Sequence, residues 1–375
     1  MSQQLERGAE ITRLARLLGV PPKELGYLDR IPAGALREFR EQATDRLFAG
    51  DAARLNRVAA ASKLLPVPLA VKIAQLAFGP LLCSATAGLL DPRHAVRIAA
   101  KCPVGFLADI TITLDPRRAA DVIAAVPTRL VVDVAKELVA RDEHVTMGRF
   151  VSYLSHETLR AAVAEIPDDA DLLKIAFVME GKERLDELLD VARPRFAGLV
   201  RTAYEQQLWA EALDLIGNVS VANLAELADI AAAQDDNLLD ALVHAAQDLH
   251  AWDALLPITA GMSPDSLRRF AEVPALQEPQ VLRTVVETAL AGPQWLDLLP
   301  LSRYLPDAAR EQLAALLAAE NDATLERLAN QADEAQLWDD LISLARSLTS
   351  EARGRLADRA RALGRTDLVD ALDTA

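Results

Sequence analysis

Histidine, cysteine and carboxylate side chains can supply metal ligation or nucleophilic catalysis, but their spacing in this 375-residue chain favours neither. No two histidines stand at i and i+4 on one helix face, and the metal-binding motif HExxH is absent. The motifs GxSxG, Walker A and GxGxxG, which position nucleophiles or phosphates, are absent as well. The sequence therefore predicts no catalytic, cofactor-binding or metal site, and a protein that is not an enzyme. The histidines are His94, His144, His156, His244 and His250.

The two cysteines, Cys83 and Cys102, lie in apolar surroundings. Two thiols form neither a disulfide framework nor a metal-ligand cluster, and a free cysteine usually behaves as a small buried hydrophobe. We therefore expect a structural role for both. Carboxylate pairs such as Asp168-Asp169 and Asp235-Asp236 fall at predicted turns, where carboxylates cap helix N-termini or face water.

One local group of basic residues is a candidate binding site for an anion or an acidic partner. Arg93, Arg97 and Lys101 stand at i, i+4 and i+8, so they share one helix face, and Arg117 and Arg118 follow further along the chain. Such a group can bind phosphate, nucleic acid or an acidic lipid surface. Aromatic residues do not interleave with it, which argues against single-stranded nucleic acid. The alternative is an ordinary solvated helix face.

Charge is unevenly distributed along the chain. The formal net charge is −15, yet residues 1–120 carry 17 Lys and Arg against 11 Asp and Glu. The remaining residues are therefore strongly acidic. This asymmetry favours an anionic partner at the N-terminal end, or it means only that two solvated surfaces differ.

The most apolar segment lies between Lys72 and Asp91, where 18 consecutive residues carry no charge. That length just reaches the threshold for a membrane span. The segment keeps the phase of a repeat whose other copies carry charges, with Gly79-Pro80 at a turn, so we expect no transmembrane segment. An apolar helical face must still be covered, either by the N-terminal residues, by a partner or second copy, or by a hydrophobic small molecule or lipid. The candidate contact residues are Leu76, Phe78, Leu81, Leu82 and Leu89.

A 24-residue repeat positions these residues. Pro68, Pro92 and Pro116 are 24 residues apart, and Asp precedes the second and third of them. Asp accepts the free N–H groups of a first helical turn and Pro fits the position after it, so each Asp-Pro predicts a helix start. A second proline about twelve residues later, Pro103 or Pro127, starts a partner helix. Each unit is therefore expected to be a hairpin of two short helices.

The second half of the chain has a longer repeat, marked by its only tryptophans. Trp209, Trp252, Trp295 and Trp338 are each 43 residues apart, and aliphatic residues recur at fixed offsets after each one. Periods of about 40–47 residues are typical of HEAT and armadillo-like helical solenoids. We expect the tryptophans to lie in the core, where they pack one unit against the next.

The 24-residue pattern of leucines, Asp-Pro and the run RRAADVIAAVP resembles the helical repeats of the cytoplasmic N-terminal domain of MgtE-type magnesium transporters. The resemblance covers residues 67–180 and implies a right-handed superhelix of short helices. The family's CBS-like regulatory region and transmembrane bundle are not found, so its magnesium sensing is not carried over.

These patterns predict an all-α fold, an elongated α-solenoid. Residues 1–65 are expected to form an N-terminal helical cap over the first unit. Residues 66–192 hold the 24-residue hairpin repeats, and residues 193–375 hold the Trp-marked repeats in a continuous array. The best candidate for a break is the segment RPRFAG, 193–198.

The predicted function is a non-catalytic scaffold that binds a protein partner, or a second copy of itself, through its concave face. The alternative is a carrier or peripheral-membrane protein that binds a hydrophobic small molecule or lipid near residues 67–90. The first 20 residues lack the apolar core of a signal peptide, so we expect a cytoplasmic protein. The excess of Arg over Lys is often seen in bacteria with GC-rich genomes.

Overall fold

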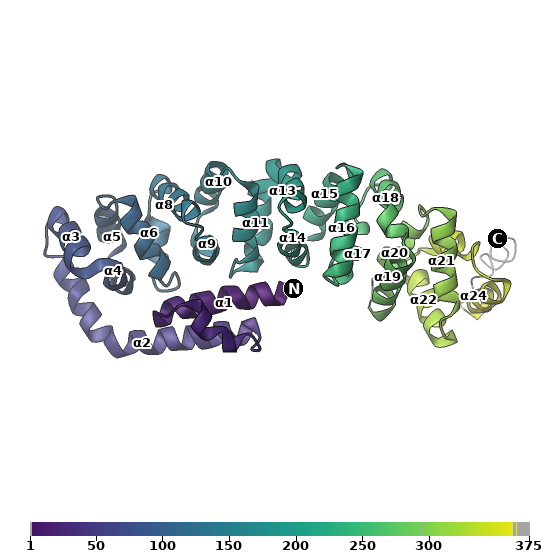
Figure 1. The fold of residues 1–375 in the computed structure, drawn as a ribbon, viewed down its shortest axis with the longest axis horizontal. Coiled ribbons are helices and arrows are strands. Elements are labelled where there is room, and N and C mark those ends of the chain that lie inside the picture. The colour runs from purple at the N-terminus through teal and green to yellow at the C-terminus, as the bar shows by residue number, and fades with distance from the viewer. Residues whose placement is uncertain (1, 293, 363–364, 366–375) are drawn as a thin grey trace. The chain divides into compact units, whose positions relative to one another are not determined.

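The computed structural model describes residues 2–292, 294–362 and 365, and within them the secondary structure is helical, with no strand. The predicted all-α class is confirmed. The chain divides into two compact units, Met1–Arg195 (unit 1) and Phe196–Ala375 (unit 2). Figure 1 shows the helices of both. The division between them falls inside the segment 193–198 that the sequence singled out.

Apart from α1 and α2, unit 1 consists of short helices that form two rows, and each helix of a row contacts the next. Helices α3, α5 and α7 contact one another in succession, and so do α4, α6, α8, α10 and α12. Each helical hairpin therefore packs mainly against the next, as expected when one hairpin alone leaves an apolar face uncovered. The helices are α1 (Ser2–Leu18), η1 (Pro22–Leu28), α2 (Ala33–Ser62), α3 (Val67–Ile73), η2 (Ala74–Phe78), α4 (Gly79–Ala87), α5 (Pro92–Ala99), α6 (Val104–Thr113), α7 (Ala120–Ala125), α8 (Thr128–Ala140), α9 (His144–Phe150), η3 (Val151–Tyr153), α10 (His156–Glu165), α11 (Asp169–Phe177), η4 (Lys182–Arg184), α12 (Leu185–Ala192) and η5 (Arg193–Arg195).

Capping residues start several of these helices. The carboxylate of Asp91 accepts the backbone N–H of His94 at 3.1 Å, and Pro92 opens α5. Ser155 and Asp168 cap α10 and α11 in the same manner. These caps satisfy N–H groups that would otherwise have no partner in the first helical turn.

The third predicted start, Asp115-Pro116, differs from this pattern. Residues 116–119 form a turn, and α7 begins only at Ala120. The carboxylate of Asp115 accepts hydrogen bonds from the backbone and side chain of Arg117 instead of serving a regular helix. An ionic contact thus replaces the expected cap.

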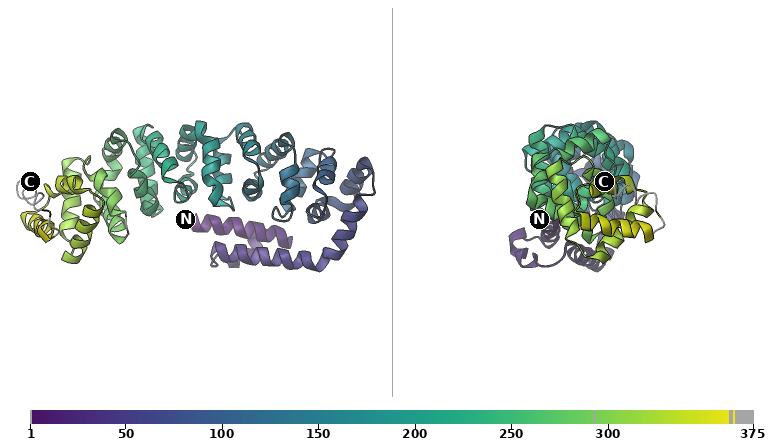
Figure 2. Two further views of the ribbon diagram at one scale, coloured as in Figure 1. Left: turned by 180° about the vertical axis from the view of Figure 1, so that it is seen from behind. Right: turned by 90° about the vertical axis from the view of Figure 1, so that its right-hand side faces the viewer.

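The N-terminal hairpin, defined here as residues 2–48, contains α1, η1 and the first half of α2. It lies alongside the other helices of unit 1, as the two views in Figures 1 and 2 show. Its helix α1 contacts α9, whereas the second half of α2 contacts α4. Of the cap expected from residues 1–65, α2 contacts α4 of the first repeat, whereas the hairpin lies against later helices, and leucines of residues 67–90 stay exposed.

Unit 2 repeats a three-helix pattern in which each tryptophan opens an eight-residue helix. The four indole side chains are buried, which confirms that they belong to the core. The Trp-bearing helices α14, α17, α20 and α23 contact one another in sequence, so they join neighbouring repeats. The helices are α13 (Phe196–Glu205), α14 (Trp209–Ile216), α15 (Val221–Ala232), α16 (Asp236–Asp248), α17 (Trp252–Thr259), α18 (Pro264–Ala271), η6 (Pro274–Gln277), α19 (Pro279–Ala291), α20 (Trp295–Ser302), α21 (Asp307–Ala318), α22 (Asp322–Glu334), α23 (Trp338–Ala345) and α24 (Ser350–Ala362).

A left-handed turn residue precedes three of the tryptophans by two positions. Gln207, His250 and Gln336 have φ values of 57°, 53° and 59°. Left-handed residues commonly end a helix and redirect the chain. The repeat is therefore encoded in backbone conformation as well as in the buried indole.

Candidate functional site

Leucine side chains on α3, η2 and α4 point into solvent. Leu76 and Leu81 are 86% and 72% exposed, and Leu64 and Leu69 are exposed beside them. Fully burying such a side chain is favourable by about 1.5–3 kcal/mol, so several exposed together are a candidate interaction surface.

Burial in α4 is the reverse of what a soluble helix normally shows. Ser84 and Thr86 are buried, at 7% and 6% exposure, whereas Leu81 faces solvent. Both hydroxyls donate to carbonyl groups of their own helix, Ser84 to Leu81 and Thr86 to Leu82, so their burial leaves no polar group unpaired. The helix thus keeps its small polar side chains inside and one of its two leucines, Leu81, outside, whereas Leu82 is half-buried.

Of the five predicted apolar contact residues, the structure exposes Leu76 and Leu81. Phe78, Leu82 and Leu89 are half-buried. Leu64 and Leu69 were missed because they precede the uncharged stretch on which the sequence interpretation rested.

By length and composition alone, one helical segment among the described residues, Val67–Ala87, could cross a membrane. Its backbone is not one regular helix. A π-helical turn, η2, is followed by Gly79 with φ 68° and ψ 176°, a conformation that stops the helix. The parts on either side, 67–78 and 79–87, extend about 18 Å and 14 Å at 1.5 Å per residue. Neither reaches across a hydrocarbon core of about 30 Å.

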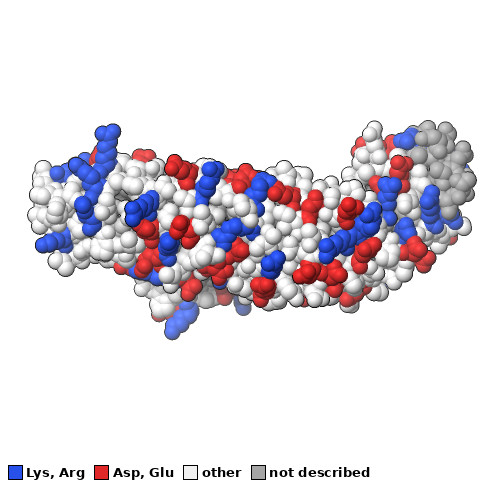
Figure 3. All heavy atoms as spheres, turned by 90° about the horizontal axis from the view of Figure 1, so that it is seen from above, with Lys and Arg blue, Asp and Glu red and all other residues white. Residues whose placement is uncertain are grey.

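The stretch of chain that carries the exposed leucines is rich in basic residues and nearly free of acidic ones. From residue 52 to residue 108 the only carboxylate is Asp91, the cap of α5. All the cations in this stretch are exposed, and in Figure 3 white and blue atoms predominate where α3 to α5 lie, at the left. Arg54 pairs with Asp51, and among the described residues no carboxylate pairs with the others. The cations are Arg54, Arg57, Lys63, Lys72, Arg93, Arg97 and Lys101.

We call these seven cations, together with Leu64, Leu69, Leu76 and Leu81, the basic apolar surface. It includes the predicted stripe Arg93, Arg97 and Lys101. Within the stripe, Arg97 also donates to the ring of His94 at 3.3 Å.

Arg117 and Arg118, predicted to join the stripe, lie elsewhere. Both are half-buried and pair with Asp115 and with Asp45 of α2. The Arg118 guanidinium also stacks over the Phe48 ring, 3.8 Å from its centroid. Both charges are paired with carboxylates within unit 1, so these two arginines are not part of the exposed stripe.

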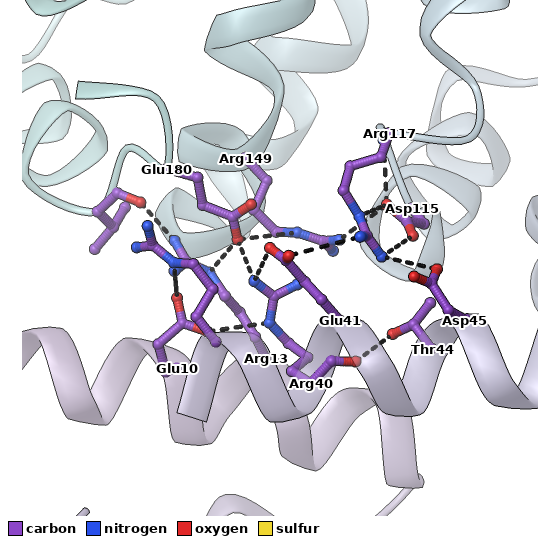
Figure 4. Close-up of polar contacts among 12 residues, drawn as sticks. Glu10, Arg13, Arg40, Glu41, Thr44, Asp45, Asp115, Arg117, Arg149 and Glu180 are labelled. Atoms are coloured by element: carbon purple, nitrogen blue, oxygen red, sulfur yellow. Dashed lines mark hydrogen bonds and ion pairs between the residues drawn. The ribbon is translucent and has the colours of Figure 1, made fainter. Parts of the chain in front are cut away.

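Arg117 borders a buried ionic cluster between the N-terminal hairpin and the rest of unit 1 (Figure 4). Glu10 accepts from Arg13 at 2.5 Å and from Arg40 at 3.0 Å. Glu180, on the segment after α11, pairs with Arg40 at 2.9 Å, with Arg13 at 3.4 Å and with Arg149 of α9 at 3.5 Å. Charges from three separated parts of the chain therefore meet.

Burial and charge act on the cluster in opposite directions. Burial by itself would raise the pKa of Glu10, but Arg13, Arg40 and Arg37 outweigh it and hold that pKa below its usual value. Burial lowers the pKa of the Arg13 and Arg149 guanidiniums, and Glu180 opposes this in both. Both arginines still form ion pairs.

Sequence reasoning missed this cluster although a signal was present. Glu10 and Arg13 stand at i and i+3, and Leu14 and Leu17 follow at i+4 and i+7 on the same helix face. Two charges on an apolar face indicate a buried pair. The sequence around their distant partner Glu180 shows no such pattern of charges on an apolar helix face.

The residues considered first for chemistry are held in structural contacts. Burial raises the pKa of Cys83 to about 11, with a smaller contribution from Cys102, and both thiols are half-buried. His94 contacts the carbonyl of Ser62 at 3.2 Å, and His144 contacts Asp171 at 2.7 Å. Among the described residues, no three His, Cys, Asp or Glu side chains gather as metal ligands.

Comparison with known proteins returns no family model, no curated protein and no solved structure that matches this chain.

Proposed function

We propose that the protein is a non-catalytic helical-repeat scaffold that attaches to an anionic lipid bilayer through its basic apolar surface. The observation that carries the proposal is the reversed burial in α4, where Leu81 faces solvent and Ser84 and Thr86 do not, within a stretch rimmed by cations. Apolar side chains that enter the headgroup region, with Lys and Arg at its edge, are the features of an interfacial helix.

The charge pattern favours a lipid surface over a neutral partner. A Lys or Arg near an anionic leaflet contributes about 1 kcal/mol, and the cytoplasmic leaflet is the anionic one. The cytoplasm is accordingly the compartment we propose. A net charge of −15 for the whole chain makes an uncompensated basic region of 57 residues hard to explain as a random excess.

The exposure of the leucines also bears on the alternatives. Leu76 and Leu81 face solvent instead of lining an enclosed space, which favours an extended surface over a small hydrophobic molecule. A second copy of the chain would bring seven cations against seven like charges, so self-association through this surface is opposed.

The scaffold part of the proposal rests on the repeats. Neighbour-to-neighbour contacts within each unit support a solenoid of stacked hairpins, of the kind that MgtE-like and HEAT-like repeats form. Such arrays present extended surfaces, and we propose that these surfaces hold protein partners at the membrane.

Sedimentation with vesicles containing phosphatidylserine tests the attachment. The full chain should co-sediment, and the double substitution Leu76→Ser and Leu81→Ser should weaken binding at least about 100-fold, because each leucine loses about 1.5 kcal/mol or more of burial.

Val221→Ser is the matched control. Val221 is an equally exposed apolar residue, 72%, but it belongs to unit 2 and is not part of the cation-rich stretch 52–108. Its loss should leave sedimentation unchanged. A natural chain that stays in the supernatant, or that forms stable dimers lost in the double variant, would refute the lipid proposal.

A further inference from the structure

The N-terminal hairpin has a hydrophobic core of its own. Ile11, Leu14, Ala15, Leu25 and Leu36 pack together, so the whole cluster comes from residues 11–36. Leu17, Val20 and Leu28 cover it from the same segment. The apolar packing of the hairpin therefore does not depend on the helices against which it lies.

Polar contacts hold the hairpin to those helices. Arg13 donates to the carbonyl of Val178 at 2.5 Å, beside its pairing with Glu180. Arg16 donates to Thr146 at 2.8 Å and to Glu143 at 3.0 Å. At the start of α1, Glu6 accepts from the side chain of Lys182 at 3.0 Å. Each of these contacts joins α1 to α9 or to the segment that follows α11.

The middle of α2 connects the hairpin to the rest of unit 1, and its side chains are not buried against any other helix. Between Arg40 and Leu55, none of the α2 side chains is buried. Leu55 and Ala59 are buried at the C-terminal end, where α2 contacts α4. Gly50, a weak helix former, lies inside this unburied stretch, and no atom lies within 4 Å of the position that a Cβ atom would take there. Opening at this point would leave the second half of α2 in place.

Separating an ionic contact and separating an apolar contact have different free-energy costs. Separating buried apolar surfaces exposes them to water at full cost, whereas separating buried ion pairs returns both charges to water and recovers their desolvation. The hairpin keeps its apolar core in either position. We propose that the N-terminal hairpin is a detachable clasp, which opens from α9 and the 178–182 segment, and at Asp45 from Arg117 and Arg118, while the rest of unit 1 stays folded.

The closed clasp covers a charged face of unit 1 on which Glu143, Arg149 and Glu180 stand. That face fits a helix with arginines three residues apart, as Arg13 and Arg16 are on α1. Glu180 is the side chain that joins the two parts most directly, since Arg13 and Arg40 approach it from the hairpin and Arg149 from α9.

Hydrogen–deuterium exchange on the full chain, read by mass spectrometry, tests the clasp. Amides of α1 should exchange faster than those of α8 and α10 in the same unit. In Glu180→Gln the clasp should open more often, because removing one partner leaves buried guanidiniums uncompensated. The detached hairpin has only the small core of residues 11–36 to hold its helices, so exchange in α1 should be at least about 100-fold faster. Exchange in α8 and α10 should not change.

Arg141→Ala is the matched control. Arg141 pairs with Asp109 and Glu137 on the exposed side of the same unit, so its removal breaks ion pairs but touches no hairpin contact. Exchange in α1 should be as in the natural chain. Equal protection of α1 and α8, or acceleration of all helices of unit 1 together in Glu180→Gln, would overturn the clasp, because the hairpin would then open only with the whole unit.

Discussion

At the scale of single residues, Glu10 decides how unit 1 responds to acid. Its side chain is 1% exposed and its pKa in the folded chain lies below its ordinary value of 4.5, because three arginines outweigh its burial. A carboxylate with a lowered folded pKa adds stability above its unfolded pKa. That stability is lost as the pH falls through the folded pKa. Unfolding below pH 4.5 should therefore become easier.

Glu10→Gln should lower the free energy of unfolding by about 3 kcal/mol at pH 7, since it leaves buried guanidiniums without a charge partner. The difference in stability between pH 7 and pH 3 should shrink in this variant. Urea unfolding followed by far-UV circular dichroism measures it, because all four tryptophans lie in unit 2 and their fluorescence does not report on unit 1. Glu24→Gln, at an exposed carboxyl group in η1, is the control, and an equal effect there would contradict the assignment.

Single residues also show what the sequence could and could not predict. The burial of the tryptophans was predictable, because burying a large apolar side chain in the core is strongly favourable and this side chain recurs at the same place in each repeat. Arg117 and Arg118 looked the same as Arg93 in the sequence, yet their partner Asp45 lies about 70 positions earlier. Pairing between distant charges depends on which helix faces meet, and local spacing carries no trace of that.

At the scale of helices, a glycine sets the distance between α9 and the segment that carries Glu180. A Cβ atom on Gly148 would stand 2.8 Å from the carbonyl oxygen of Val178, and Glu180 donates its backbone N–H to the Gly148 carbonyl at 3.3 Å. Only a residue without a side chain allows this approach. The helix and the ionic cluster are therefore linked through one backbone contact.

Gly148→Ala should lower the stability of unit 1 by about 1–3 kcal/mol, because the added methyl group must displace backbone. Thermal unfolding by circular dichroism gives the measurement. Gly50→Ala is the matched control inside α2, where no atom lies within 4 Å of the new Cβ, and it should raise stability by up to about 1 kcal/mol. If both variants destabilised alike, the close approach at Gly148 would not be the cause.

Helix starts were predictable where a cap acts locally, as at Asp91 and Ser155, since the signal and its partner are three residues apart. The break at Gly79 was predicted as a turn, but the π-helical turn before it was not. An i to i+5 hydrogen-bond pattern is chosen by packing around the helix and has no composition of its own. Leu76, predicted as a contact residue, lies in that turn and is exposed.

At the scale of the whole chain, the net charge and the local charge lead to opposite predictions for binding to an anionic membrane. A protein of net charge −15 should be repelled by an anionic membrane, whereas the basic apolar surface should be attracted to it. At about 0.15 M salt, charges are screened beyond roughly 8 Å, so a membrane in contact with this surface responds to the cations beside it. The local pattern should therefore win at physiological ionic strength, and binding should weaken as salt rises.

Charge reversal at Lys63 and Lys72 separates the two forecasts. A Lys near an anionic surface contributes about 1 kcal/mol, and a Glu in its place is repelled by a similar amount. Changing both to Glu should therefore weaken binding to phosphatidylserine vesicles by roughly 100- to 1,000-fold. The pair Arg129→Glu and Lys136→Glu on α8 changes the net charge of the chain by the same amount, at exposed positions outside the surface. If that pair weakened binding equally, net charge would govern and the basic apolar surface would have no special part. A selective loss at Lys63 and Lys72 means that the bilayer responds to the charges around Leu64 to Leu81 and not to the sum over the chain.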